Sequence, residues 1–162
     1  MLSMATPSSS VMTEAESLEI RLTSDPRWLR VLRAAVGQVG HLAGLTPQAV
    51  DQLKLAVDEA CANIILHGYE GKRGEPIVAT LYLYPDRLEV RLRDFGKKVA
   101  PDSIRPLEPN ATRPGGLGVH LIHSCMDEVL YESADGEGMV LRLVKYVRES
   151  PEGTGGSTRP KS

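Results

Sequence analysis

Residues 53–69 read LKLAVDEACANIILHGY and form the most strongly patterned segment of the chain. Apolar residues recur there every three or four positions, as on the buried face of an amphipathic helix: Leu53, Ala56, Val57, Ala60 and Ile64. Upstream, Thr46-Pro47 supplies an N-cap and a first-turn proline, and Gly68 is a typical helix stop. The pattern predicts a helix from about residue 47 to residue 67, packed against a sheet.

A second set of side chains on this helix carries chemical groups. Glu59, Asn63 and His67 are four residues apart and therefore form a column beside the apolar stripe. A carboxylate can accept a proton, and an amide oxygen one turn away can bind a hard cation such as Mg²⁺. The alternative is a solvated helix face with an asparagine there by chance.

The segments around this helix predict an α+β domain. Strands are expected at residues 18–22, 77–84, 88–94, 129–132 and 139–147, and further helices after Asp25-Pro26 and from Leu117. Residues 77–94 and 129–147 each read as an antiparallel hairpin. Because strands and helices do not alternate strictly, we expect a two-layer sandwich in which helices cover one face of a mostly antiparallel mixed sheet.

The chain is expected to hold one domain, at residues 15–148 of 162. Residues 1–14 are small and polar, and residues 149–162 are rich in Gly, Ser and Pro, which is typical of disordered tails. Residues 95–116 contain four prolines and no hydrophobic period. A loop of that length inside a compact domain is usually functional or mobile.

Charge and composition exclude several classes of function. With 19 basic and 21 acidic side chains, the net charge is −2 and there is no basic stripe, which argues against a nucleic-acid partner. No apolar run approaches the ~18 residues of a membrane span, and residues 1–14 do not resemble a secretory signal. Two cysteines do not make a disulfide scaffold. We expect a cytoplasmic protein with an aliphatic core, since only 4% of its residues are aromatic.

Asp94 occupies an inward position of a predicted strand. Leu88, Val90 and Leu92 define the buried parity of that strand, and Asp94 continues it. A buried carboxylate is costly without a hydrogen-bond donor, and the amino group of a flat heterocycle such as adenine is a suitable donor. Gly96 follows and allows another group to approach the backbone closely. The alternative is a strand-end residue turned to solvent.

Residues 113–118, RPGGLG, directly precede the last predicted helix. Glycines at a helix entrance let backbone N–H groups close on an anion, and the helix dipole favours it. The alternative is a flexible hinge. A Walker A loop is excluded because no Gly-Lys-Ser/Thr follows. A Rossmann fingerprint is disfavoured because a proline-rich loop precedes the glycines.

In this order, the three features resemble the GHKL ATPase superfamily and its Bergerat fold. The nearest resemblance is to the anti-sigma-factor serine/threonine protein kinases, whose ATPase domain is of the histidine-kinase-like type. It is carried by VDEACAN (57–63), RPGGLGVH (113–120) and MDEV (126–129), and it spans roughly residues 16–148.

The resemblance implies a role for each motif. Glu59 would be the general base that activates a serine hydroxyl, and Asn63 would hold Mg²⁺. Asp94 would accept a hydrogen bond from the adenine amino group of ATP, and Gly96 would make room for the ring. The phosphates would lie at Gly115, Gly116, Leu117 and Gly118, with residues 95–114 as a lid.

The resemblance also implies partners: a sigma factor, a STAS-domain anti-anti-sigma protein that is phosphorylated, and a second copy of the chain in a homodimer. One alternative is a non-catalytic module that binds partners in a nucleotide-dependent way. Another is a regulatory module of a phosphatase or other signalling pathway, which shares the fold. Glu59 favours the kinase, because a pure binder has little use for a carboxylate beside a metal ligand.

The chain departs from the family pattern at two places. Lys97-Lys98 follow Gly96 where many relatives have a second Gly or a Pro. Met139 stands where relatives often carry a Thr near the adenine. Neither departure touches Glu59 or Asn63.

Overall fold

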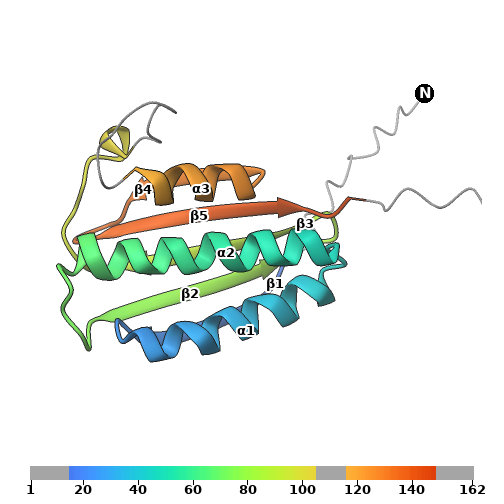
Figure 1. The fold of residues 1–162 in the computed structure, drawn as a ribbon, viewed down its shortest axis with the longest axis horizontal. Helices are drawn as coiled ribbons and strands as arrows, with labels where there is room; N and C mark the ends of the chain where they lie inside the picture. The colour runs from blue at the N-terminus through green and yellow to red at the C-terminus, as the bar shows by residue number, and fades with distance from the viewer. Residues whose placement is uncertain (1–14, 105–115, 149–162) are drawn as a thin grey trace, which may run out of the picture.

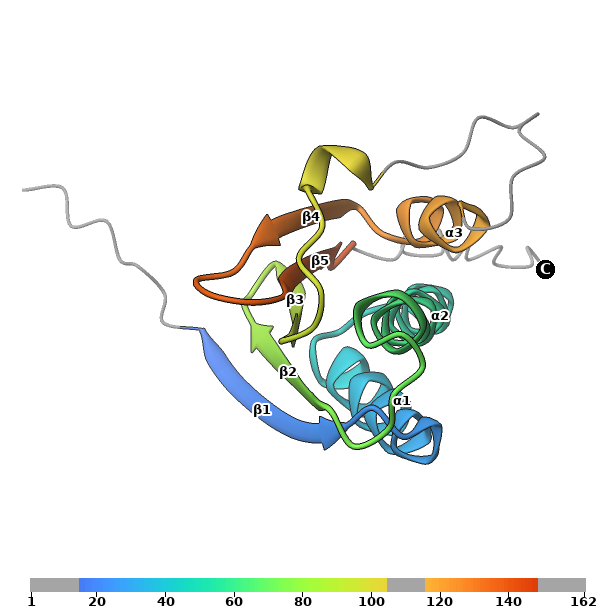
Figure 2. The same ribbon diagram turned by 90° about the vertical axis from the view of Figure 1, so that its left-hand side faces the viewer.

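The computed structural model describes residues 15–104 and 116–148, which form a two-layer α+β sandwich (Figure 1). The elements are β1 (Glu16–Thr23), α1 (Pro26–Leu42), α2 (Pro47–Asn63), the π-helix η1 (Ile64–Gly68), β2 (Pro76–Leu83), β3 (Arg87–Asp94), the 3₁₀ turn η2 (Pro101–Ser103), α3 (Leu117–Cys125), β4 (Glu128–Ser133) and β5 (Met139–Tyr146). The described strands form one sheet in the order β1-β2-β3-β5-β4, and every neighbouring pair is antiparallel. Figure 2 shows α1, α2 and α3 on the same side of this curved sheet. The predicted α+β sandwich is confirmed.

Several predictions concern residues outside the described ranges. The expected tails, 1–14 and 149–162, lie there, and so do Gly115 and most of the expected lid. Of residues 95–114, the structure describes 95–104, which include η2.

The two long helices begin at the capping signals found in the sequence. The side chain of Asp25 accepts a hydrogen bond from the backbone N–H of Arg27 at 3.0 Å, and that of Thr46 accepts one from Ala49 at 3.2 Å. A proline follows each cap, where its missing N–H costs no helical hydrogen bond. Helix α2 lies between α1 and α3 (Figure 1).

The predicted helical segment ends in a wider turn than expected. It ends at Gly68, one residue beyond the predicted end at residue 67, and its last five residues form η1. The N–H of Tyr69 donates to the carbonyl of Ile64 at 2.9 Å, five residues back. Such π turns are rare and frequently occur at functional sites.

The space between the layers is filled by aliphatic side chains, as the composition predicted. Leu53, Val57 and Ala60 of α2 are at most 1% exposed and belong to the same buried cluster as the inward residues of the central strands. Those strand residues are Ile77, Ala79, Leu81, Leu88, Val90, Leu92, Leu141 and Leu143. On the edge strand β1, the expected half-burial holds for Ile20 and Leu22, whereas Leu18 is exposed.

One lysine is buried inside the sandwich. Lys145 shares the inward parity of Leu141 and Leu143 and is only 8% exposed. Its Nζ donates to Oε1 of Gln52 at 2.8 Å and to the carbonyl of Cys125 at 2.6 Å. The ammonium group therefore ties β5 to α2 and to the end of α3.

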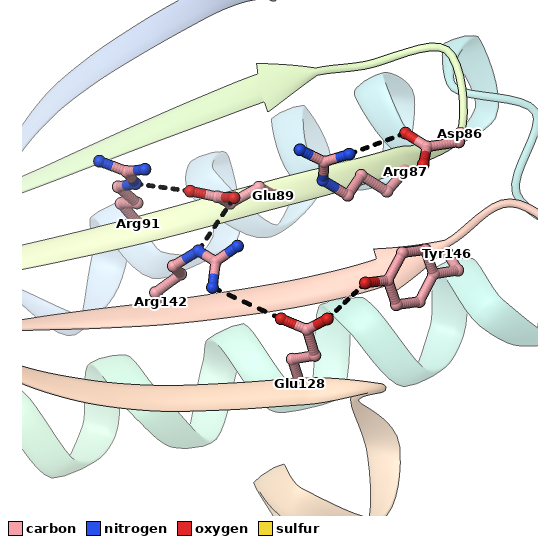
Figure 3. Close-up of polar contacts among 7 residues, drawn as sticks. All are labelled: Asp86, Arg87, Glu89, Arg91, Glu128, Arg142 and Tyr146. Atoms are coloured by element: carbon pink, nitrogen blue, oxygen red, sulfur yellow. Dashed lines mark hydrogen bonds and ion pairs between the residues drawn. The ribbon is translucent and has the colours of Figure 1, made fainter.

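The outer face of the sheet carries a charged network (Figure 3). Glu89 points away from the helices, yet its side chain is only 2% exposed. Its two carboxylate oxygens lie 2.6 Å from Nε of Arg91 and 3.0 Å from Nε of Arg142. Arg142 also reaches Glu128 at 3.4 Å, and the hydroxyl of Tyr146 donates to Glu128. These contacts join β3, β5 and β4.

We predict that Glu89→Ala lowers the free energy of unfolding by about 2 kcal/mol, because it leaves Arg91 and Arg142 close together without their shared carboxylate. Urea denaturation measures the change. The matched control is Glu19→Ala, which removes an exposed partner of Arg21 at the same two-residue spacing. The control should cost less than about 0.5 kcal/mol. Equal losses in the two variants would contradict a structural role for Glu89.

Candidate functional site

A cavity of about 300 Å³ lies between the end of α2, the end of β3 and the start of α3. Asn63 and His67 reach it from α2 and η1, Asp94 from β3 and Val119 from α3. Its volume is at the lower end of the range for small-molecule sites. Residues from distant parts of the sequence, including two of the three predicted motifs, therefore line one cavity.

Asp94 is a buried carboxylate in this cavity. It is 4% exposed, so the alternative of a strand-end residue turned to solvent is wrong. Its Oδ1 accepts a hydrogen bond from the N–H of Gly96 at 2.9 Å. Burial raises the pKa of Asp94, and the Gly96 N–H opposes that rise. A ligand with a hydrogen-bond donor is therefore well suited to this position.

The backbone behind Asp94 is packed closely at two glycines. A Cβ atom on Gly96 would overlap the carbonyl of Gly68, and the next N–H, of Lys97, donates to that carbonyl at 2.9 Å. A Cβ atom on Gly138 would overlap the carbonyl of Asp94. Gly96 is not among the residues that line the cavity, so the close approach allowed at this glycine is made by the Gly68 backbone.

Tyr69 fastens the same region. Its hydroxyl accepts a hydrogen bond from the N–H of Phe95 at 2.8 Å and donates to the carbonyl of Pro76. Tyr69, the residue directly after η1, is thereby joined to the start of β2 and to the residue that follows β3. This clamp holds the backbone directly after Asp94 against the first residue of the neighbouring strand β2.

The glycine-rich start of α3 lies against the column of polar residues on α2. A Cβ atom built on Gly118 would be 3.0 Å from Oε2 of Glu59 and 3.6 Å from the side-chain amide of Asn63. Gly116 is the N-cap and provides no side-chain hydrogen bond to the helix end. Leu117 is 77% exposed. The structure therefore brings Glu59, Asn63 and Gly118 together.

The three polar residues of the predicted column, on α2 and η1, differ in how far they are exposed to solvent. Glu59 and Asn63 are half-buried, whereas His67 is exposed. Among the described residues, no three His, Cys, Asp or Glu side chains are grouped as a metal cage. Mg²⁺ usually takes only one or two protein oxygens and completes its shell with water and phosphate. Asn63, beside Glu59, suits that mode of binding.

On the far wall of the cavity, the family resemblance had placed Met139 near the adenine, whereas Tyr131 and Leu141 were missed. Tyr131, Met139 and Leu141 line this wall from β4 and β5. The inward parity of β5 was a signal for Met139 and Leu141. Tyr131 is opposite Leu141 in the sheet register, and that pairing is known only from the fold.

Comparison with known proteins identifies the family. The model of the histidine kinase-like ATPase domain matches residues 22–145. The serine-protein kinase RsbW of a Bacillus cereus strain is 31% identical over 156 residues, covering 90% of this chain and 94% of the relative. The protein of the same name from Listeria innocua is 31% identical over 146 residues, covering 85% and 91%. This chain belongs to the histidine kinase-like ATPase family.

As a member of this family, the chain is expected to use ATP, and the residues present fit that ligand. Asp94 offers a buried acceptor, and Met139 and Leu141 offer apolar surface to a flat base. The hydroxyl of Tyr131 is buried and has no hydrogen-bond partner within residues 15–104 and 116–148. The prediction of a serine/threonine kinase agrees with the names of the relatives. None of the helices that the structure describes is long and apolar enough to cross a membrane.

We predict that Gly96→Ala costs about 2–3 kcal/mol of stability, because the new methyl group would force the backbone of Gly68 away. Chemical denaturation monitors the loss. The control, Gly74→Ala, has a φ of +86° but open space around the new methyl group, and should cost about 1 kcal/mol. A Gly96→Ala variant no less stable than the control would show that the approach to Gly68 is dispensable.

Proposed function

We propose that this protein is an ATP-dependent serine protein kinase that acts as an anti-sigma factor. The observation that carries the kinase assignment is the approach of α3 to α2, with the Cβ position of Gly118 only 3.0 Å from Oε2 of Glu59. A carboxylate is thereby placed at the N-terminal end of a helix, the end that favours phosphate.

The base of ATP binds at Asp94. Its amino group donates to the buried carboxylate, and its faces contact the aliphatic side chains of the cavity wall. This mode of binding needs no aromatic platform, in keeping with the low aromatic content of the chain. Specificity comes from the hydrogen bond and from the shape of the cavity.

The phosphates bind at the start of α3. Backbone N–H groups are offered there by Gly116, Leu117 and Gly118. We include Gly115 in this proposed phosphate-binding segment. Asn63 would hold Mg²⁺, which would supply positive charge to the phosphate oxygens. The absence of a side chain on Gly118 leaves space between this turn and Glu59.

Glu59 acts as the general base. Its carboxylate takes the proton of the attacking serine hydroxyl while the bond from the serine oxygen to the γ-phosphorus forms. The bond from that phosphorus to the bridging oxygen of ADP breaks, and the charge on the leaving ADP is stabilised at the helix end. The products are phosphoserine and ADP.

The proposed partners are those that the family resemblance implies. A STAS-domain anti-anti-sigma protein supplies the serine, and a sigma factor is sequestered by the same chain, which acts as a homodimer in the cytoplasm. The names of the RsbW relatives support a serine in a protein as the acceptor. Neither nucleic acid nor a membrane takes part.

We predict that Glu59→Gln lowers phosphate transfer at least about 100-fold, because the amide cannot take the serine proton. The assay follows radiolabelled phosphate from ATP to a serine of the cognate STAS-domain antagonist. The amide keeps the size of the side chain, so ATP affinity and the circular-dichroism melt should stay near those of the wild type. The control, Asp51→Asn, changes a 75% exposed carboxylate on the same helix and should transfer normally.

Two outcomes would overturn this proposal. Full transfer by Glu59→Gln would remove Glu59 from the reaction. Tight ATP binding by the wild type, with no transfer to the STAS-domain protein, would favour the alternative of a nucleotide-dependent binding module.

A further inference from the structure

Tyr131 lines the cavity, and the proposed chemistry does not use its hydroxyl. This hydroxyl is buried without a hydrogen-bond partner among the described residues. The neighbouring ring of His123 is 6.5 Å away between centroids and tilted by 39°, so the two side chains pack without a hydrogen bond. An unpaired buried hydroxyl destabilises a protein on its own, and a bound ligand that pairs with it removes that cost.

The sheet register relates Tyr131 to Asp94. Tyr131 is opposite Leu141, and Leu141 is opposite Leu92, so these three residues form a row across β4, β5 and β3. Asp94 lies two residues further along β3. Strand spacing places Tyr131 about 10 Å across the sheet from β3, with Asp94 about 7 Å further along. Both side chains share the inward face and line the same cavity.

The surface between these two polar groups is apolar. Met139 and Leu141 of β5 lie there and contribute side chains without N–H or O–H groups. A flat ring resting on them has one edge toward Asp94 and another toward β4. Tyr131 stands at the β4 side of this apolar surface.

We propose that the hydroxyl of Tyr131 donates a hydrogen bond to a ring nitrogen of the adenine whose amino group Asp94 accepts. This inference rests on the proposed binding of ATP in the cavity and adds a second residue that reads the base. Adenine offers both groups, since its amino group donates and its ring nitrogens accept.

The protonation state of Tyr131 suits this role. Burial raises the pKa of Tyr131 to about 12, so the hydroxyl keeps its proton at neutral pH and donates. The carboxylate of Asp94, by contrast, accepts a hydrogen bond from the amino group of the base. The two residues therefore recognise opposite hydrogen-bonding groups of one base, and the combination distinguishes adenine from a ring that lacks either group.

The test compares Tyr131→Phe with the wild type by calorimetric titration of ATP and of its 1-deaza, 3-deaza and 7-deaza analogues. We expect Tyr131→Phe to bind ATP about 3- to 10-fold more weakly, the loss of one neutral hydrogen bond. One analogue should bind the wild type more weakly by a similar factor, and Tyr131→Phe should not distinguish that analogue from ATP. Without nucleotide, Tyr131→Phe should melt at the same temperature as the wild type or higher.

The matched control is Tyr82→Phe, on the outer face, where the ring packs under the guanidinium of Arg91 at 4.8 Å. It should leave ATP binding unchanged. Wild-type affinity in Tyr131→Phe would overturn the inference while leaving the proposed ATP site intact. So would a loss of affinity that is the same for ATP and all three analogues, because the hydroxyl would then contact another part of the nucleotide. A folded wild type that binds no ATP would instead overturn the proposed function itself.

Discussion

The carboxylate of Asp94, buried at the end of a central strand, imposes the main constraint on this molecule. A charged group at that depth needs nearby donors and a rigid backbone, and the structure supplies both. The N–H of Gly96 bonds to it at 2.9 Å. The backbone is packed closely at the corner around Asp94. A Cβ atom on Gly96 would overlap the carbonyl of Gly68, and a Cβ atom on Gly138 would overlap the carbonyl of Asp94. The hydroxyl of Tyr69 joins the N–H of Phe95 to the carbonyl of Pro76 beside this corner.

Helix α2 connects this corner to the rest of the fold. Its apolar stripe packs on the sheet, while Glu59 and Asn63 on its flank meet the first turn of α3. The π turn at its end brings Gly68 to Asp94, and Lys145 ties β5 to both α2 and α3. The relative positions of the motifs are therefore set by the packing of the core. This packing brings residues that are far apart in the sequence into contact at the site.

Much of the fold follows from local signals. The helix starts at Asp25 and Thr46 were predictable because each cap acts within three residues of itself, and the inward position of Asp94 followed from strand parity. The burial of Glu89 was not predictable, because Arg91 and Arg142 cover it only once β3 and β5 pair. The wall at Tyr131 depends on the order of strands in the sheet. These contacts are tertiary, and one sequence carries no local trace of them.

The most direct test of the site is a comparison of ATP with inosine triphosphate, whose base carries a carbonyl in place of the amino group. Calorimetric titration of the wild type and of Asp94→Asn with both nucleotides measures whether the carboxylate reads that amino group. We expect the wild type to bind ATP at least about 10-fold more tightly than inosine triphosphate, the scale of a charge-assisted hydrogen bond. In Asp94→Asn this preference should disappear, with a melt close to that of the wild type. Equal affinities of the wild type for the two nucleotides would contradict the assignment of Asp94.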